Sequence, residues 1–355
     1  MTSPDAASAT AGAELIRQYE RHLDEKVARV RALLGGGGLA PLFHGIERCP
    51  VERGYRTRAT FGYATPGDGR LTGVDPRTGR QPWESTLWVL PEGMREQVRA
   101  VERVLAGSSL ATALTGFEMR LEYGSGRAHV LLGVPRAAGV DVLPLCDELL
   151  ARVPDLLGVS VPSQGIELRE AYLRHRLLGK VVLSHYLAFF QTNLWLTPEL
   201  VKEAQREVHQ PASIVDLYCG VGLHAVHAAH RGSRIIGTDN NRWAIQSALR
   251  NAELHGLQHA RFCGGSVEAL LEEEQLTEPD VVFVNPSRLG CSPGVPQAVA
   301  GWRPHRIVLV SCSIDSHVRD TLALAGAGYR PRGVRCFDMF PFSEFLESVT
   351  VFEPG

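Results

Sequence analysis

The stretch Ile214-Val-Asp-Leu-Tyr-Cys-Gly-Val-Gly222 predicts a strand, a tight glycine turn and the start of a helix. Glycine lets the backbone approach a ligand closely, and a helix N-terminus offers free N–H groups. A second strand pattern, Arg234-Ile-Ile-Gly-Thr-Asp239, ends in a carboxylate placed to bind the ribose hydroxyls of a nucleotide-like cofactor. The alternative is an ordinary strand–helix turn with a surface Asp239. Two cofactors fit this pattern, NAD and S-adenosylmethionine.

The sequence beyond this stretch favours one of the two cofactors. Five strand patterns alternate with helical patterns, at 213–218, 233–238, 259–263, 279–285 and 305–311, which predicts a doubly wound parallel α/β sheet. Two more strand patterns, at 329–338 and 348–353, follow with only a short loop between them. Such a closing hairpin is typical of the seven-stranded, Rossmann-like sheet of class I S-adenosylmethionine methyltransferases. The loose fingerprint Gly220-x-Gly222-x-x-Ala225 keeps NAD as the alternative.

Composition bounds the class of protein. The chain has 355 residues, 44% of them hydrophobic, and a formal net charge of −2. No apolar run is long enough to span a membrane and the N-terminus has no secretory pattern, so we expect a cytoplasmic protein without a membrane partner. The seven cysteines form no CxxC pair, so we expect free thiols and neither a metal nor an iron–sulfur cluster. We also expect a monomer.

The N-terminal half is expected to contain two further parts. Residues 1–40 predict a disordered start followed by an amphipathic helix from Ala13 to Leu34, because apolar residues recur there at steps of three and four. Residues 41–170 predict a smaller, β-rich α+β domain with many turns. Residues 171–355 are then left for the α/β domain.

An arginine-rich stretch lies at the start of the expected β-rich domain. Its arginines are Arg48, Arg53, Arg56, Arg58, Arg70, Arg77 and Arg80, and they are interleaved with Tyr55, Phe61 and Tyr63. This pattern predicts an RNA-recognition face, with arginines on phosphates and rings as stacking platforms. A solvated strand surface explains the spacing equally well. Arg56 and Arg58 are the candidate substrate contacts.

Four stretches in the C-terminal half carry a resemblance to a known family. They are Phe190-Gln-Thr-Asn193, Asn285-Pro-Ser-Arg-Leu-Gly290, Ser311-Cys-Ser313 and Asp338-Met-Phe-Pro-Phe-Ser-Glu-Phe-Leu-Glu347. In this order they resemble motifs of the RNA uracil-5-methyltransferases, which form 5-methyluridine. Two N-terminal stretches, Gln18-Tyr-Glu-x-x-Leu-x-Glu-Lys26 and Cys49-Pro-Val-x-x-x-Tyr-Arg-x-Arg58, are similar to the tRNA-specific branch. The rRNA-specific branches carry cluster cysteines with a spacing that this chain lacks.

The resemblance implies a catalytic pair. C5 of uracil becomes nucleophilic enough to take a methyl group only after a thiolate has added to C6. Cys312 is the candidate nucleophile, at a strand tip between two serines, where a thiol can be exposed and its pKa lowered. Glu347 matches the family's base, which removes the C5 proton. The alternatives are that Cys312 is a buried structural cysteine and that Glu347 is an exposed loop carboxylate. Cys219 is the other candidate nucleophile, and Glu344 is the other candidate base.

The resemblance also implies the binding residues. Gln191, Tyr218, Asp239 and Asn285 fall on the family's contacts to S-adenosylmethionine, and Gly220 and Gly222 supply the close approach of the backbone. Arg288 is the third candidate substrate contact, with its role open between a substrate phosphate and a structural ion pair.

Four departures from the family pattern bear on the function. Ser287 replaces a proline, Ser313 replaces an asparagine, Phe345 replaces a histidine and Leu223 replaces a polar cofactor contact. We therefore expect methylation of uracil C5 in structured RNA, with tRNA favoured, and keep three alternatives: an rRNA substrate, a divergent RNA-binding paralogue with reduced or no turnover, and a methyltransferase for a small molecule or protein.

Overall fold

The computed structural model describes residues 4–63, 71–75, 79–273 and 276–355. It divides into two compact units. Unit 1 comprises Met1–Glu52, Leu187–Gln191 and Trp195–Gly355, and unit 2 comprises Arg53–Tyr186 and Thr192–Leu194. The domain boundaries were expected after residues 40 and 170. In the structure, the chain passes from unit 1 to unit 2 near residue 52 and returns to unit 1 near residue 187.

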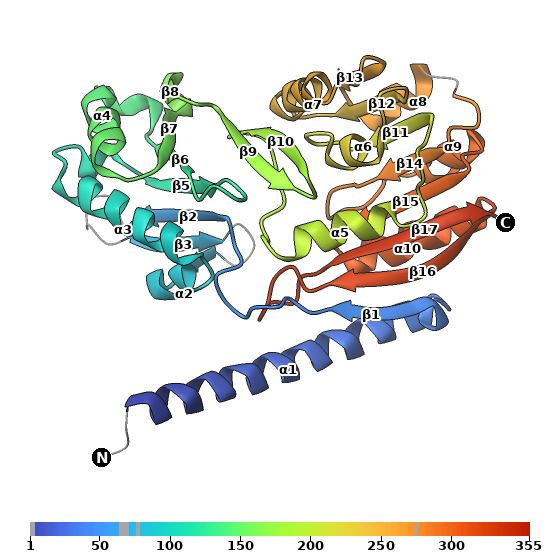
Figure 1. The fold of residues 1–355 in the computed structure, drawn as a ribbon, viewed down its shortest axis with the longest axis horizontal. Coiled ribbons are helices and arrows are strands. Elements are labelled where there is room, and N and C mark those ends of the chain that lie inside the picture. The colour runs from blue at the N-terminus through green and yellow to red at the C-terminus, as the bar shows by residue number, and fades with distance from the viewer. Residues whose placement is uncertain (1–3, 64–70, 76–78, 274–275) are drawn as a thin grey trace. The chain divides into compact units, whose positions relative to one another are not determined.

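Unit 1 is built on an eight-stranded sheet in the order β1-β16-β17-β15-β14-β11-β12-β13 (Figure 1). Its central strands are parallel neighbours: β11 (Ser213–Leu217), β12 (Arg234–Asp239), β13 (Ala260–Gly264), β14 (Val281–Val284) and β15 (Arg306–Ser311). Short runs of β-branched and aliphatic residues form these strands, and β14 and β15 are buried almost throughout, as expected for a parallel sheet covered by helices. The predicted α/β fold is confirmed.

The sheet closes with the predicted hairpin and with one strand that the sequence pattern did not reveal. β16 (Tyr329–Phe337) and β17 (Glu347–Pro354) pair antiparallel, and β17 also pairs antiparallel with β15. The edge strand β1 (Phe43–Glu47) pairs parallel with β16. Its five residues, Phe-His-Gly-Ile-Glu, show no clear alternation, so its position was apparent only from tertiary pairing.

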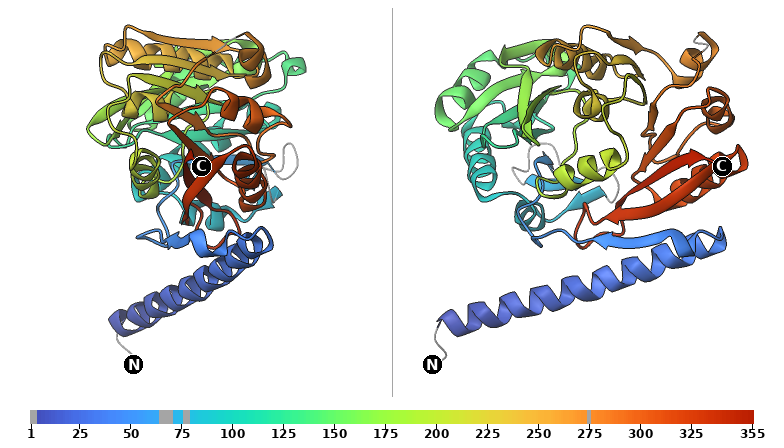
Figure 2. Two further views of the ribbon diagram at one scale, coloured as in Figure 1. Left: turned by 90° about the vertical axis from the view of Figure 1, so that its right-hand side faces the viewer. Right: turned by 45° about the vertical axis from the view of Figure 1, so that its right-hand side comes forward.

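Helices pack on this sheet, and their bounds are α1 (Pro4–Gly36), α5 (Leu196–Gln205), α6 (Leu223–Ala228), α7 (Arg242–Leu254), α8 (Val267–Glu273), α9 (Val295–Gly301) and α10 (Ile314–Gly326). α1 runs along β1 at the edge of the sheet (Figures 1 and 2). It begins nine residues before the predicted Ala13, because the alanine-rich sequence after Pro4 has high helix propensity. Val30 and Leu34 of α1 are buried against Ile314 and Leu346. No helix in the described part of the chain is long and apolar enough to cross a membrane.

Unit 2 holds a seven-stranded sheet in the order β4-β3-β2-β5-β6-β7-β8. Its strands are β2 (Arg58–Tyr63), β3 (Leu71–Asp75), β4 (Gly79–Gln81), β5 (Gly116–Leu121), β6 (Ala128–Gly133), β7 (Leu156–Val161) and β8 (Ile166–Arg169). The helices α2 (Trp83–Trp88), α3 (Glu92–Gly107) and α4 (Leu143–Arg152) complete its core.

A separate hairpin, β9 (Tyr172–Leu177) and β10 (Lys180–His185), also belongs to unit 2, although the sequence boundary placed it in the α/β domain. The backbone N–H groups of Arg174 and Arg176 donate to Glu122 and Tyr123, 2.7 and 3.0 Å away, which ties the hairpin to the β-rich unit.

Candidate active site

The predicted site residues of unit 1 gather at one edge of its sheet. Parallel strands end at the same edge, so the residues that follow β11, β12, β14 and β15 are brought together there. β17 runs antiparallel to β15, so it begins at this edge. Asp239, Asn285, Cys312 and Glu347 all lie at such strand ends.

The glycine loop after β11 adopts a left-handed turn and contacts the second strand tip. Gly220 and Gly222 have φ values of 54° and 77°, which favour glycine. The N–H of Gly220 donates to Oδ2 of Asp239 over 3.0 Å. A Cβ atom on Gly222 would lie 3.3 Å from Cζ of Phe262 and 3.4 Å from Cβ of Ala248. The loop is thus held close to Asp239, with Gly222 buried against Phe262 and Ala248.

Asp216, inside β11, is a buried acid whose role the sequence pattern did not reveal. It is 1% exposed, and its Oδ2 accepts the N–H of Ala225 in the first turn of α6 over 3.2 Å. Its Oδ1 has no hydrogen-bond partner among the described residues. Burial raises the pKa of Asp216 well above its ordinary value, against the opposing effect of the Ala225 N–H. A hydrogen-bond acceptor therefore remains unsatisfied beside the glycine loop.

Three further predicted cofactor contacts lie near this loop or within the same unit. Tyr218 has a φ of 58° and packs its partly buried ring against the cluster that includes Val267 and Cys291. Burial raises the pKa of Tyr218 to about 12. The N–H of Asn285 donates to the carbonyl of Leu217 over 3.2 Å, which places Asn285 beside the start of the loop. Gln191 is 6% exposed in unit 1.

Cys312 and Glu347 face each other across the β15–β17 pairing. The last paired residues are Ser311 and Ser348, and the same register continued by one step brings Cys312 opposite Glu347. The two groups interact electrostatically, because Glu347 is one of the groups that raise the pKa of Cys312. The structure therefore brings together the two residues that the sequence assigned to catalysis.

The thiol pKa differs from the sequence-based expectation. Burial raises the pKa of Cys312 to about 11, and the nearby Glu347 raises it further, while Arg288 acts in the opposite direction. Burial also raises the pKa of Glu347 to about 8, again against Arg288. The expected low thiol pKa is wrong because Cys312 is partly buried, and this burial outweighs the neighbouring cation.

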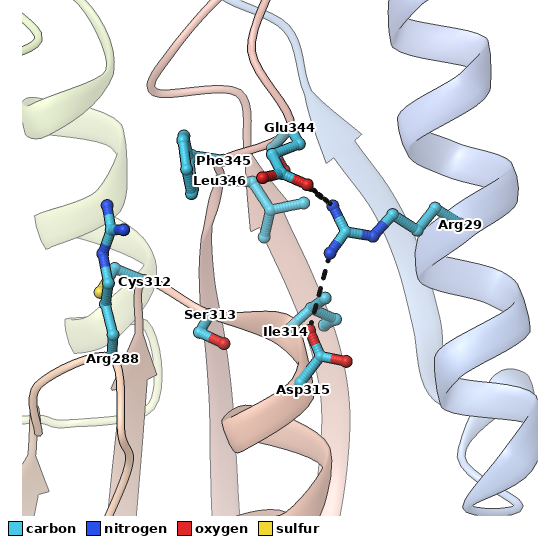
Figure 3. A pocket seen from close by; sticks show the side chains of 9 residues that line it. All are labelled: Arg29, Arg288, Cys312, Ser313, Ile314, Asp315, Glu344, Phe345 and Leu346. Atoms are coloured by element: carbon cyan, nitrogen blue, oxygen red, sulfur yellow. Dashed lines mark hydrogen bonds and ion pairs between the residues drawn. The ribbon is translucent and has the colours of Figure 1, made fainter. Parts of the chain in front are cut away.

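Arg288 is held next to the thiol by an aromatic ring. Its guanidinium lies 4.5 Å from the centroid of the Phe345 ring, and it hydrogen-bonds the Cys312 side chain. Figure 3 shows Arg288, Cys312 and Phe345 around one cavity of about 190 Å³. Phe345, which departs from the family's histidine, thus supports the arginine through a cation–π contact. The cavity is lined by Arg29, Arg288, Cys312, Ser313, Ile314, Asp315, Glu344, Phe345 and Leu346.

The two rival residues occupy different environments. Cys219 is 6% exposed. Burial is the main reason why the pKa of its thiol lies well above the ordinary value, and the nearby carboxyl groups of Asp216 and Asp239 raise it further. Glu344 lines the cavity but is an exposed carboxylate, 3.0 Å from Nη1 of Arg29. Neither forms a pair like that of Cys312 and Glu347.

The predicted RNA face in unit 2 needs a correction. Tyr55, Phe61 and Tyr63 are 3%, 1% and 6% exposed, so they are core residues and not stacking platforms. Phe61 and Tyr63 lie two residues apart in β2 and share its buried face, where Phe61 stacks on Phe117 at 4.9 Å, whereas Tyr55 precedes the strand. The pattern of arginine and aromatic residues had mixed two opposite faces of one strand.

The candidate arginines of that stretch remain partly accessible. Arg58 pairs with Glu118 at 2.8 Å, and Arg120 contacts the same carboxylate at 2.6 Å. Burial raises the pKa of Glu118, but the two arginines outweigh it and hold the pKa below its ordinary value. Arg56 donates from Nε to the carbonyl of Arg58 over 2.9 Å. Arg70 and Arg77 lie outside the described residues.

Comparisons with known proteins agree with this fold. Residues 209–310 match a family model described as a methyltransferase domain. A crystal structure of Pyrococcus abyssi tRNA (uracil-54, C5)-methyltransferase in complex with S-adenosyl-L-homocysteine superposes with a TM-score of 0.72 over 94% of this chain and 83% of that one, at 23% identity. The chain has the class I methyltransferase fold.

Curated relatives of this methyltransferase fold are RNA methyltransferases by name, so the predicted resemblance to that group is confirmed. An uncharacterized RNA methyltransferase of Caldanaerobacter subterraneus is 34% identical over 51% of this chain. Another, of Gloeobacter violaceus, is 26% identical over 94% of this chain and 78% of its own length. The chain spans only 41% of the length of the Caldanaerobacter relative.

Proposed function

We propose that this chain is an S-adenosylmethionine-dependent methyltransferase that acts on C5 of uracil in structured RNA, with tRNA as the favoured substrate. The observation that carries the proposal is the constellation of Cys312, Glu347 and Arg288 at the sheet edge that also holds the glycine loop. A thiol with a carboxylate opposite it and a cation beside it suits addition to an electron-poor pyrimidine ring followed by proton removal.

The residues of the loop fit the cofactor. Gly220 has open space where a Cβ atom would lie, Gly222 permits the turn through its positive φ, and Asp239 can accept from ribose hydroxyls. The unsatisfied Oδ1 of Asp216 offers an acceptor to a further donor. S-adenosylmethionine, when bound, supplies the electrophilic methyl group.

Each residue of the constellation has a defined task. The Cys312 thiolate adds to C6 of the flipped uracil and makes C5 nucleophilic. Arg288 stabilises the thiolate before addition and again when it leaves. After C5 has gained its methyl group, Glu347 takes the C5 proton, and the C6–sulfur bond breaks to return the thiolate. Arg288 opposes the effect of burial on the pKa of Glu347 and so favours the ionised carboxylate that takes this proton.

The test uses RNA that contains 5-fluorouridine together with S-adenosylmethionine. In 5-fluorouridine, fluorine replaces the C5 hydrogen, and a base cannot remove it as it removes a proton. The reaction should therefore stop at a covalent protein–RNA adduct, which is visible as a shifted band on a denaturing gel. Cys312→Ala should lose the adduct, whereas the matched thiol control Cys219→Ala should retain it. An adduct that persists in Cys312→Ala would overturn the proposed nucleophile.

Two findings keep a divergent RNA-binding paralogue as the second candidate. The raised thiol pKa lowers the fraction of thiolate at neutral pH, and Ser313 and Phe345 replace the family's polar neighbours of the pair. This reading predicts RNA binding without formation of 5-methyluridine. Nucleoside mass spectrometry of tRNA and rRNA after incubation distinguishes it from the main proposal and separates the two RNA substrates.

A further inference from the structure

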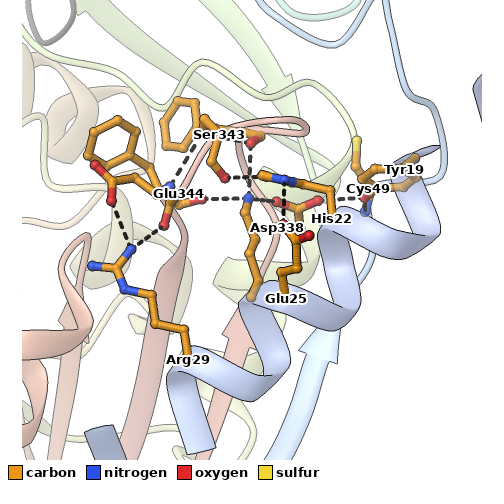
Figure 4. A network of polar contacts seen from close by, with 11 residues as sticks. Tyr19, His22, Glu25, Arg29, Cys49, Asp338, Ser343 and Glu344 are labelled. Atoms are coloured by element: carbon orange, nitrogen blue, oxygen red, sulfur yellow. Dashed lines mark hydrogen bonds and ion pairs between the residues drawn. The ribbon is translucent and has the colours of Figure 1, made fainter. Parts of the chain in front are cut away.

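Helix α1 presents one polar face to the segment between β16 and β17. Tyr19, His22, Lys26 and Arg29 follow each other at steps of three and four, so they share one side of the helix. All four contact residues 338–345, which have no regular secondary structure (Figure 4). This segment, residues 338–346, directly precedes Glu347 and is called the catalytic segment below.

The strongest contacts of this face are buried. Lys26 is 4% exposed and forms an ion pair with Asp338, which is fully buried. The Tyr19 hydroxyl donates to the other oxygen of Asp338 over 2.6 Å and accepts the N–H of Cys49 over 3.0 Å. Asp338 is therefore bound on both oxygens by residues of one helix, and this fixes the start of the catalytic segment.

Lys26 also binds the far end of the segment. Its Nζ donates to the carbonyl of Phe340 over 3.1 Å and to the carbonyl of Phe345 over 3.0 Å. His22 contacts the carbonyl of Ser343 through Nε2 over 3.0 Å. A single ammonium group thus joins Asp338 to Phe345, the residue whose ring supports Arg288 beside Cys312.

We propose that Lys26 of α1 is a positioning residue of the catalytic site, which holds the catalytic segment so that Phe345 supports Arg288 and Glu347 faces Cys312. The functional part of this inference rests on the proposed methyl transfer, whereas the positioning of the thiol does not. Lys26 touches none of the reacting groups and acts through the carbonyls of Phe340 and Phe345. Without these two hydrogen bonds, the segment keeps the contacts of α1 with Ser343 and Glu344 but loses those at the carbonyls of Phe340 and Phe345.

Two variants separate positioning from stability. Lys26→Met removes the ammonium group and leaves the Asp338 carboxylate buried without its cation, which should destabilise unit 1. Adding Asp338→Asn removes that charge, and the amide oxygen that replaces the carboxylate can still accept from Tyr19, so stability should recover. Both variants lack the hydrogen bonds to Phe340 and Phe345. Lys202→Met, at an exposed lysine of α5, is the matched control.

The first measurement needs neither RNA nor cofactor. Alkylation of Cys312 by iodoacetamide is followed against pH, with peptide mass spectrometry to resolve this thiol from the other six. Burial is the largest cause of the raised pKa of the Cys312 thiol, and the catalytic segment lines the same cavity as Cys312. Release of the segment should therefore lower the pH midpoint of alkylation from about 11 toward the ordinary value of a thiol. We expect this shift in both Lys26 variants and not in Lys202→Met.

The second measurement is turnover on RNA. We expect kcat to fall on the order of 10- to 100-fold in both Lys26 variants while KM changes little, since misplaced reacting groups affect the chemical step. Recovery of melting temperature, alkylation midpoint and kcat together in the double variant would overturn the positioning role. Absence of 5-methyluridine with the unmodified protein would refute the proposed function instead, and the alkylation result would still decide whether Lys26 positions the site.

Discussion

Arg288 is the residue on which the electrostatics of the cavity depend. It lowers the pKa of both Cys312 and Glu347, whereas burial raises the pKa of each group. One guanidinium therefore favours the charged form of the nucleophile and of the base. Its planar stacking on Phe345 also distinguishes an arginine from a lysine at this position.

Replacing Arg288 tests this dependence. Arg288→Met removes the charge but keeps a long side chain, so the thiol pKa should rise and alkylation of Cys312 at a fixed alkaline pH should slow. Arg288→Lys keeps the charge without the planar stack and should have an intermediate rate. Faster alkylation in Arg288→Met would show that access to the thiol, and not its charge, limits the reaction.

Glu347→Gln should have opposite effects on stability and turnover. Burial raises the pKa of Glu347 in the folded protein to about 8 from an ordinary value of 4.5. Between these two values the folded protein holds a proton that the unfolded chain has released, so stability falls as pH rises and the loss is complete above about pH 8. The glutamine variant lacks this loss, and calorimetry should show a higher melting temperature than the unmodified protein above about pH 8 and a smaller difference below about pH 5.

The same variant should trap the reaction after methyl transfer. Without a base for the C5 proton, the C6–sulfur bond cannot break, so a covalent adduct with uridine-containing RNA should accumulate in Glu347→Gln when S-adenosylmethionine is present. Glu344→Gln is the control, because its carboxylate pairs with Arg29 at the cavity edge. Equal adduct formation in the two variants would contradict the role of Glu347.

The loop after β11 depends on backbone conformation more than on side chains. Gly222 precedes α6, has a φ of 77° and faces Phe262 and Ala248 at contact distance. These two constraints act together, because a side chain would strain the backbone and push against the helix and strand beneath it.

Gly222→Ala should weaken binding of S-adenosylhomocysteine and lower the stability of unit 1 by roughly 1 kcal/mol. Titration calorimetry measures the binding and thermal unfolding measures the stability. Gly264→Ala is the matched control, since Gly264 ends β13 and a Cβ atom there would meet nothing within 4 Å. Unchanged binding in Gly222→Ala would contradict the assignment of this loop to the cofactor.

At the level of the complete chain, the candidate RNA contacts Arg56 and Arg58 belong to unit 2, and the proposed catalytic residues belong to unit 1. Arg56→Glu is expected to raise KM for RNA and reduce the steepness of its salt dependence, with little change in kcat, because a phosphate contact adds affinity without touching the reacting atoms. Arg206→Glu, after α5, is the control. A salt dependence that does not respond to Arg56→Glu would place the RNA face elsewhere.

The sequence predicted those features that arise locally. The strand tips that carry Asp239, Asn285 and Cys312 follow from short apolar runs, and the order of these runs predicts that their tips share one edge. The pKa of the Cys312 thiol is raised by burial in the folded chain and by Glu347, which is distant in sequence, so the residues next to Cys312 could not reveal it. The burial of Phe61 and Tyr63 was missed because composition does not show which side of a strand is covered.

The ion pair between Lys26 and Asp338 has a consequence for synthesis. Tyr19 and Asp338 are 319 residues apart, so α1 leaves the ribosome roughly 15–60 s before its partner exists at typical rates of translation. Unit 2, whose strands lie between them, can complete its own sheet during that interval. The buried lysine and β1 must meanwhile stay solvated or be sheltered by a chaperone. Only when β16 and β17 emerge can the thiol and carboxylate meet, so a stalled nascent chain carries a finished β-rich unit without an assembled reactive centre.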